Sequence, residues 1–161
     1  MIIDLTDLMI GNVDFIDIDD DVIIDNSYFD NTSIRDLVGT RFYGNVIRIG
    51  DSYQLKGILS GIMILPDDVT LQDVDYNYEV SILEDFDDGD EFFDIVQNKL
   101  DITDFLWQNI LVEVPSKVKD KKNKDLILEG DGWRLITEDE LDKGNESPFS
   151  ELNNIFNSRK E

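Results

Sequence analysis

The stretch TRFYGNVIRIGDSYQLKGILSGIMIL, residues Thr40 to Leu65, decides the fold. Apolar and polar residues alternate on both sides of Gly50-Asp51-Ser52, which is typical of two antiparallel strands joined by a tight turn. The stretch therefore predicts a long β-hairpin. Gly44, Gly57 and Gly61 are unusual inside strands, and they predict bulges or bends that curve the sheet toward a partly closed barrel.

Further strands are expected on both sides of this hairpin. Pro66-Asp67-Asp68 ends it, and the period-two pattern of Tyr76, Tyr78, Val80 and Ile82 then predicts an antiparallel strand that pairs with residues 53–65. Apolar and β-branched composition marks other candidates, which are Val13–Ile18, Val22–Ile24, Phe92–Val96, Leu126–Leu128 and Trp133–Ile136.

The spacing of apolar residues changes at Asp101. Ile102, Phe105, Leu106 and Ile110 recur every three or four residues, which predicts an amphipathic helix near 101–113, capped by Asp101 or Thr103 and ended by Pro115. Pro148 begins a second predicted helix near 148–158. The fold class is therefore α+β, a curved and mostly antiparallel β-sheet with two helices.

The chain length favours one domain. Its 161 residues suffice for one core, so we expect a single domain over 1–161, with a basic linker at about 116–125 and a helical tail at about 146–161. The first ten residues lack a basic leader region, and no apolar run is long enough to span a membrane. We therefore expect a cytoplasmic protein that makes no membrane contact.

Charge points to the chemistry of the partner. The chain has 37 Asp and Glu against 14 Lys and Arg, a net charge of -23, so it repels polyanions and favours a basic protein as its partner. Two groups form the predicted acidic surface: a solvated turn between strands and a loop over 84–91. Their members are Asp19, Asp20 and Asp21 in the turn, and Asp85, Asp87, Asp88 and Asp90 in the loop.

The residue types present restrict catalysis. There is no cysteine and no histidine, so the usual nucleophile–base pairs and zinc sites cannot form, and the glycine-rich phosphate loops are also absent. The 84–91 loop does not have EF-hand spacing, because Phe86 falls where an oxygen ligand is needed. We assign no catalytic residue, metal or cofactor. A carboxylate-dependent hydrolase or a magnesium-assisted nuclease remains the alternative function.

Two short segments are candidates for partner contacts. Trp107 fits core packing and an exposed contact equally well, and its neighbours Gln108 and Asn109 belong to the same candidate surface. Lysine fills five of the eight positions from Lys117 to Lys124, which suits either an exposed linker or RNA contact. These partner-binding candidates are Trp107, Gln108, Asn109, Lys117, Lys119, Lys121, Lys122 and Lys124.

Three stretches of the chain resemble the YceD family of large ribosomal RNA subunit accumulation proteins. They are the glycine-punctuated hairpin Phe42–Leu65, the string LDITDFLWQNILVEVP from Leu100 to Pro115, and ESPFSELNNIF from Glu146 to Phe156. The middle stretch is the most specific. Relatives place a Cys-x-Arg-Cys motif after the hairpin and often a second cysteine cluster after the helix. Here Pro66-Asp67-Asp68-Val69 and the lysine tract stand in those places.

The resemblance implies a non-catalytic role in ribosome biogenesis, in the accumulation or processing of large-subunit ribosomal RNA. We expect the partner to be a basic ribosomal protein or assembly factor, which an acidic protein can attract by electrostatic steering. Contact with ribosomal RNA would then be indirect or made by the lysine tract. Direct RNA recognition by the curved sheet is a third possibility.

Overall fold

The structure is a computed structural model and describes residues 1–87, 90, 92–119, 129–130 and 133–134. The chain divides into two compact units, Met1–Asp120 and Lys121–Glu161. The predicted helix near 148–158, the predicted strand Leu126–Leu128, and Lys121, Lys122 and Lys124 lie outside the described residues. The elements of the first unit are β1 (Ile2–Asp4), α1 (Thr6–Met9), β2 (Phe15–Asp21), η1 (Asn26–Phe29), β3 (Asp36–Ile49), β4 (Ser52–Pro66), β5 (Asp73–Phe86), β6 (Asp94–Val96), β7 (Lys99–Asp101) and α2 (Thr103–Val112).

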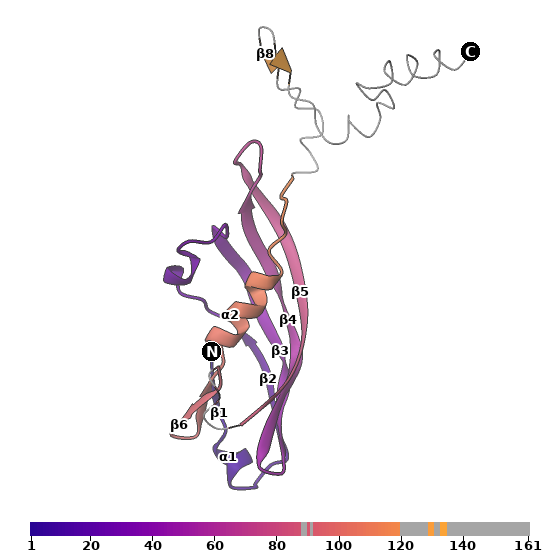
Figure 1. The fold of residues 1–161 in the computed structure, drawn as a ribbon. Coiled ribbons are helices and arrows are strands. Elements are labelled where there is room, and N and C mark those ends of the chain that lie inside the picture. Colours follow the sequence, from indigo (N-terminus) through magenta and orange to yellow (C-terminus); the bar gives the residue numbers. More distant parts are fainter. Residues whose placement is uncertain (88–89, 91, 120–128, 131–132, 135–161) are drawn as a thin grey trace, which may run out of the picture. The chain divides into compact units, whose positions relative to one another are not determined.

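The predicted hairpin forms the centre of the first unit. Strands β2, β3, β4 and β5 make a four-stranded antiparallel sheet in that order, so the described residues form an open sheet with β2 and β5 at its edges (Figure 1). The fold class, α+β with mostly antiparallel strands, is confirmed. The expectation of a partly closed barrel is not confirmed.

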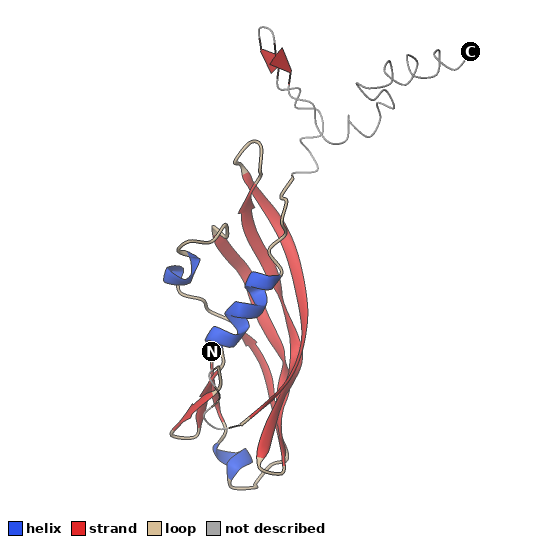
Figure 2. Cartoon of the chain, in the orientation of Figure 1, coloured by secondary structure: helices blue, strands red, loops and turns tan. Residues whose placement is uncertain are grey.

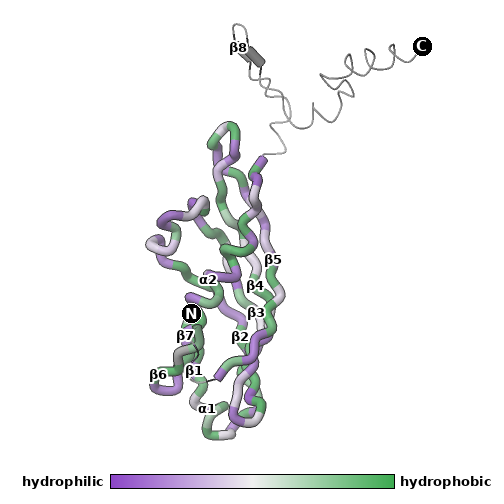
Figure 3. The backbone as a smooth tube through the Cα atoms, viewed as in Figure 1, coloured by the Kyte–Doolittle hydropathy of each residue, from purple (hydrophilic) through white to green (hydrophobic). Residues whose placement is uncertain are grey.

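One face of this sheet carries the core. Residues of β3 and β4 alternate between the two faces, as the pleat of a strand requires, and Phe42, Val46, Leu55 and Leu59 on the inner face are completely buried. Helix α2 and the small sheet β1-β7-β6 lie on this side of the large sheet (Figure 2). In Figure 3, where the backbone is coloured by hydropathy, the long strands change repeatedly between hydrophobic and hydrophilic residues. The other, outer face has no helix over it among the described residues.

Two of the strand glycines permit close approach of the strands, and the third lies at a bulge. Gly44 pairs directly with Gly57, and a Cβ atom on Gly44 would lie 2.2 Å from the carbonyl oxygen of Lys56. A Cβ atom on Gly57 would lie 2.6 Å from the ring of Phe42. The register shift lies between Val38 and Arg41, where Gly39 and Thr40 of β3 stand opposite the single residue Gly61 of β4. The prediction of a bulge is therefore confirmed at Gly61. It was wrong for Gly44 and Gly57, which pair in regular register and leave no room for a side chain because the neighbouring strand lies too close.

Aromatic rings connect the sheet to the helix. Tyr53 stacks on Phe86 with ring centroids 5.5 Å apart, Phe86 stacks on Phe93 at 4.3 Å, and Phe93 contacts Phe105 of α2 at 4.7 Å. Such contacts add to the apolar burial of the core, in which Leu106 and Ile110 of α2 are fully buried. The predicted helix is thus confirmed, and the aromatic series fixes its position against β5.

The acidic segment Asp19–Asp21 belongs to a strand. The sequence predicts a solvated turn there, but these residues continue β2 and pair with Arg41–Tyr43 of β3. Arg41 contacts two of their carboxylates, and the ladder satisfies their backbone groups. Similarly, Glu84 to Phe86 of the predicted acidic loop complete β5. Strand pairing with distant residues overrides the local turn signal in both places.

Within the second unit the structure describes a two-stranded pairing. Strand β8 (Glu129–Gly130) pairs antiparallel with β9 (Trp133–Arg134), with Glu129 opposite Arg134. Of the predicted turn Gly130-Asp131-Gly132, Gly130 belongs to β8 and residues 131–132 lie outside the described residues. The strand predicted at Trp133–Ile136 is confirmed for its first two residues.

Candidate partner-binding surface

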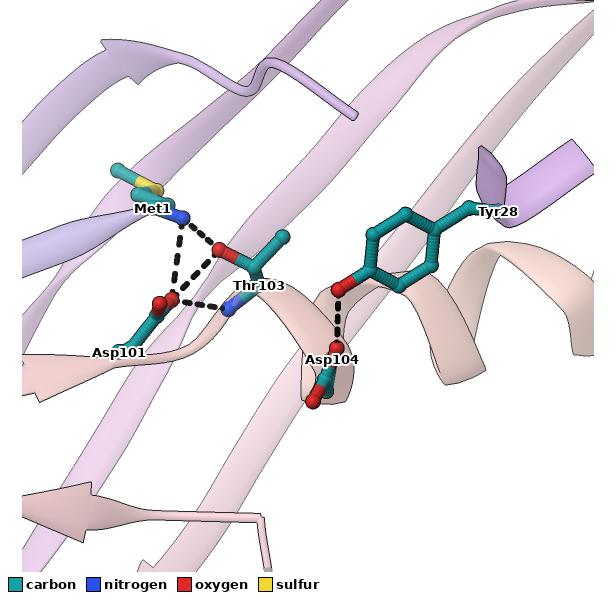
Figure 4. A network of polar contacts seen from close by, with 5 residues as sticks. All are labelled: Met1, Tyr28, Asp101, Thr103 and Asp104. Atoms are coloured by element: carbon teal, nitrogen blue, oxygen red, sulfur yellow. Dashed lines mark hydrogen bonds and ion pairs between the residues drawn. The ribbon is translucent and has the colours of Figure 1, made fainter. Parts of the chain in front are cut away.

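A polar network fixes the start of α2 (Figure 4). The Met1 ammonium contacts the Asp101 carboxylate at 3.2 Å and the Thr103 hydroxyl, and Asp101 accepts the Thr103 backbone N–H at 2.9 Å. Burial acts to raise the pKa of Asp101, but the hydrogen bonds from Thr103 and the ammonium outweigh it and lower the pKa. The N-cap residue is Ile102, which makes no side-chain cap, so the prediction that Asp101 or Thr103 occupies that position was wrong; Asp101 instead accepts the N–H of the first helical residue from the position before the cap.

A second contact holds the same end of α2 against the loop before β3. Tyr28 donates a hydrogen bond from its hydroxyl to Asp104, which raises the pKa of Tyr28 (Figure 4). The helix is therefore held at its first turn from two directions. This orientation decides which side of α2 reaches solvent.

Trp107 lies in the core. It is 5% exposed and packs against Tyr28 at 5.7 Å and Phe29 at 5.8 Å between ring centroids. The sequence left packing and exposed contact open, and the structure supports packing. Trp107 therefore has little exposed surface with which to contact a partner.

The two residues that follow Trp107 reach the surface. Gln108 is exposed and Asn109 is half-buried, donating its amide to the Phe105 carbonyl at 2.9 Å. Both line a hollow of about 290 Å³ between α2 and β5, together with Glu84, Phe92, Phe105 and Val112. The structure brings these two predicted residues together, but separates them from the predicted acidic groups on the outer face of the sheet.

The predicted acidic residues that the structure describes lie at different places. Asp19 and Asp21 flank Arg41 at 2.8 and 3.4 Å, and the hydrogen bond from Arg41 lowers the pKa of Asp19. Asp85 accepts a hydrogen bond from Gln54 at 2.6 Å on the outer face. The Asp90 carboxylate accepts the Asp87 backbone N–H at 2.8 Å. Asp20 is exposed on β2, and Asp88 lies outside the described residues.

The lysine tract begins beside the turn between β4 and β5. Lys117 and Lys119 are exposed, and Val118 between them is buried. Val118 donates its N–H to the Asp68 carboxylate at 2.9 Å, and its carbonyl accepts the Asp68 N–H at 2.9 Å. The turn after β4 and the start of the lysine tract are thus adjacent in this fold, joined by backbone and carboxylate hydrogen bonds.

The outer face of the large sheet carries an apolar centre. Tyr43 and Leu83 are each 66% exposed, and Ile58 is 42% exposed. Tyr43 pairs with Ile58, and Leu83 pairs with Lys56, so the three apolar side chains lie on adjacent strands. They line a hollow of about 450 Å³ above the paired glycines of β3 and β4. Exposed apolar residues gathered on one face are a common mark of an interaction site.

Acidic residues border this apolar centre on both edge strands. By alternation, Asp17, Asp19 and Asp21 of β2 and Asp73, Asp75, Glu79 and Asp85 of β5 point to the outer face. Arg41 and Arg35 form ion pairs with some of them. Asp75 and Glu79 make no ion pair with any described residue. The outer face therefore combines an apolar middle with negative edges.

None of the described residues predicted from the sequence to bind a partner lies on this face. Its signal was nevertheless present in β4, where Ile58, Ile62 and Ile64 add a second apolar series to the buried Leu55, Leu59 and Met63. A strand that is apolar on both faces is normally packed against other elements on both faces. In the described part of the chain, other elements pack only on the inner face of β4.

Among the described residues, no group of three or more Asp or Glu side chains is placed to hold a metal ion. No helix in the described part of the chain is long and apolar enough to cross a membrane.

Comparisons with known proteins give one similarity. No family model matches the chain, and no solved structure matches it. The uncharacterized protein YlbN of Bacillus subtilis (strain 168) is 28% identical to it over 120 residues, which cover 68% of this chain and 70% of that protein. The chain is thus similar to a bacterial protein over most of the length of both.

Proposed function

We propose that this protein is a non-catalytic, cytoplasmic factor of ribosome biogenesis that binds a basic ribosomal protein or assembly factor and supports the accumulation or processing of large-subunit ribosomal RNA. The three stretches that resemble the YceD family give the proposal its biological setting. The outer face of the β2-β3-β4-β5 sheet gives it a physical basis.

The observation that carries the proposal is the apolar centre between two acidic edges. Burying Tyr43, Ile58 and Leu83 against a partner contributes binding free energy through the apolar area removed from water. The acids of β2 and β5 select a partner with positive charges around an apolar patch, and they speed its association. Ribosomal proteins have this chemistry, because they are basic and also form folded domains.

A pull-down with matched surface variants tests the proposal. The tagged full chain is recovered from its own organism at low salt, and ribosomal proteins and assembly factors are identified. We expect the intact protein to retain at least one of them, and Tyr43→Ala combined with Leu83→Ala to lose it. Ile23→Ala is the control, because Ile23 is 85% exposed and lies outside the sheet. Retention should weaken as salt approaches about 1 M, where the screening length is only about 3 Å.

A cellular measurement accompanies the pull-down. Cells without the gene are expected to show a lower ratio of large-subunit to small-subunit ribosomal RNA, and the intact gene but not the Tyr43 and Leu83 double variant should restore it. The proposal fails if the intact protein retains no ribosomal protein or assembly factor at low salt. It also fails if the RNA ratio is unchanged without the gene.

A further inference from the structure

Strand β5 offers a long open edge. It runs over 14 residues at the border of the large sheet, and among the described residues it pairs on one side only, with β4. No described residue makes a backbone hydrogen bond to its other side. An exposed edge of this length is a template for another extended segment, unless its side chains prevent pairing.

The phase of the β4–β5 ladder shows which backbone groups are open. Asp67 donates its N–H to the Gln72 carbonyl at 2.8 Å just beyond the ends of the strands, while Pro66, opposite Asp73, has no N–H to donate. Hydrogen-bonded and non-hydrogen-bonded pairs alternate along an antiparallel ladder, and this register has no shift. The odd-numbered residues from Asp73 to Asp85 therefore direct their N–H and C=O groups away from β4.

The same odd-numbered residues point their side chains to the outer face. They include Asp73, Asp75, Glu79 and Asp85, so the open backbone groups and most of the negative charge of β5 belong to one set of positions. The strand holds five Asp or Glu residues and no Lys or Arg. Two copies of this edge would repel each other, since like charges placed opposite each other destabilise a strand pair.

We infer that the edge of β5 binds an extended basic segment of a partner protein as a fifth strand of the sheet. Main-chain hydrogen bonds to the odd-numbered residues supply affinity. Lysine or arginine at every second position of the segment faces Asp75, Glu79 and Asp85, which gives specificity. The inference rests on the proposed function, and it names the chemistry and the conformation that the partner presents.

The test uses a pair of synthetic peptides and the full chain. One peptide of about ten residues alternates lysine with valine, a length that covers most of the edge. The second peptide has the same sequence, with N-methyl groups on the alternate backbone nitrogens that would face β5. Its charge is unchanged, but it cannot donate hydrogen bonds to the edge of the strand. We expect the methylated peptide to bind at least about tenfold more weakly, because strand addition depends on main-chain pairing.

Variants of β5 test the same edge from the protein side. Ser81 is exposed and lies in the middle of β5, opposite Ile58. Because it is one of the odd-numbered residues, its N–H points away from β4. Ser81→Pro removes that N–H and leaves the β4 ladder intact, since proline is tolerated on the open side of an edge strand. We expect about a tenfold loss of affinity for the alternating peptide, against less than about twofold for Ser81→Ala. Asn77→Pro provides a second position if the first variant does not fold.

The outcomes separate this inference from the proposed function. Equal binding of the two peptides overturns the inference, as does equal binding by Ser81→Pro and Ser81→Ala. If Ser81→Pro still captures the ribosomal partner while the Tyr43 and Leu83 double variant does not, the face binds the partner and the edge does not. If the alternating peptide binds more tightly than the methylated one and prefers Ser81→Ala over Ser81→Pro, but no ribosomal partner is captured, the inference about the β5 edge is supported and the proposed function fails.

Discussion

Replacing Gly44 by alanine is expected to destabilise the central hairpin through the backbone. The new methyl group would lie 2.2 Å from the Lys56 carbonyl oxygen and 2.7 Å from the Gly57 Cα atom. Both are main-chain atoms of the facing strand, so no side chain can rotate away. The strands would have to separate locally by about 1 Å, which weakens van der Waals contacts and ladder hydrogen bonds.

The expected magnitude follows from two opposing effects. Overpacking of this kind costs about 1–3 kcal/mol, and a clash with backbone belongs at the upper end. Alanine also lowers the conformational entropy of the unfolded chain, which offsets about 0.4–1 kcal/mol. We expect Gly44→Ala to lower the free energy of unfolding by about 2 kcal/mol. With a urea m-value of about 2 kcal/mol/M, the unfolding midpoint falls by about 1 M.

Urea unfolding followed by far-ultraviolet circular dichroism measures the shift, with two comparison variants. Asn45→Ala changes the next residue, which lines the open outer hollow, and should stay within about 0.5 kcal/mol. Gly61→Ala should cost less than Gly44→Ala, because the nearest backbone atom to its Cβ would be the Thr40 Cα at 3.0 Å rather than a carbonyl oxygen at 2.2 Å. A midpoint for Gly44→Ala within about 0.3 M of the parent would refute the close approach of β3 and β4.

Three further substitutions test the core and the start of α2. Trp107→Ala should cost about 3–5 kcal/mol in chemical unfolding, because its ring packs in the aromatic core; a cost below about 1 kcal/mol would contradict that burial. Tyr78→Phe should cost about 1–3 kcal/mol by leaving the buried Thr40 hydroxyl, 2.8 Å away, without its partner, and adding Thr40→Val should recover part of it; simple additivity in this double-mutant cycle would contradict the coupling. The lowered pKa of Asp101 means that its carboxylate stabilises the fold above pH 3.8 and that this contribution is lost as the pH falls through the lower folded-state value, so Asp101→Asn should reduce the melting temperature more at pH 7 than at pH 2. The side chain is about half exposed, which keeps the effect below about 1 kcal/mol, and an equal deficit at both pH values would argue against the ionic contact.

Local patterns predicted the long elements of the fold. The hairpin of β3 and β4, the strand β5 and the helix α2 each extend over enough residues for a period of two or 3.6 to be counted. Strands β1 and β7 were missed, because each has three residues and they pair with each other across almost the whole first unit, Ile3 opposite Leu100. A strand of three residues contains no measurable period, so only the tertiary pairing defines it.

The candidate surface was harder to predict from the sequence. Acid runs were assigned to loops because charge clusters usually lie there, yet Asp19 and Asp85 are strand residues. Whether a side chain of β5 belongs to the core or to the outer face depends on which side of the sheet α2 occupies. That choice depends on contacts such as Phe93 with Phe105 and not on the strand's own sequence.

The alternation along β5 separates two kinds of evolutionary freedom. Even-numbered positions such as Tyr78 and Ile82 are held by the core and by the β4 ladder, so most replacements there reduce stability. Odd-numbered positions such as Asp75 and Glu79 can change charge or size at little cost to folding. A protein built in this way can acquire a new binding preference by mutation on alternate residues of one strand. A combinatorial library restricted to those residues would sample such preferences without destabilising the sheet.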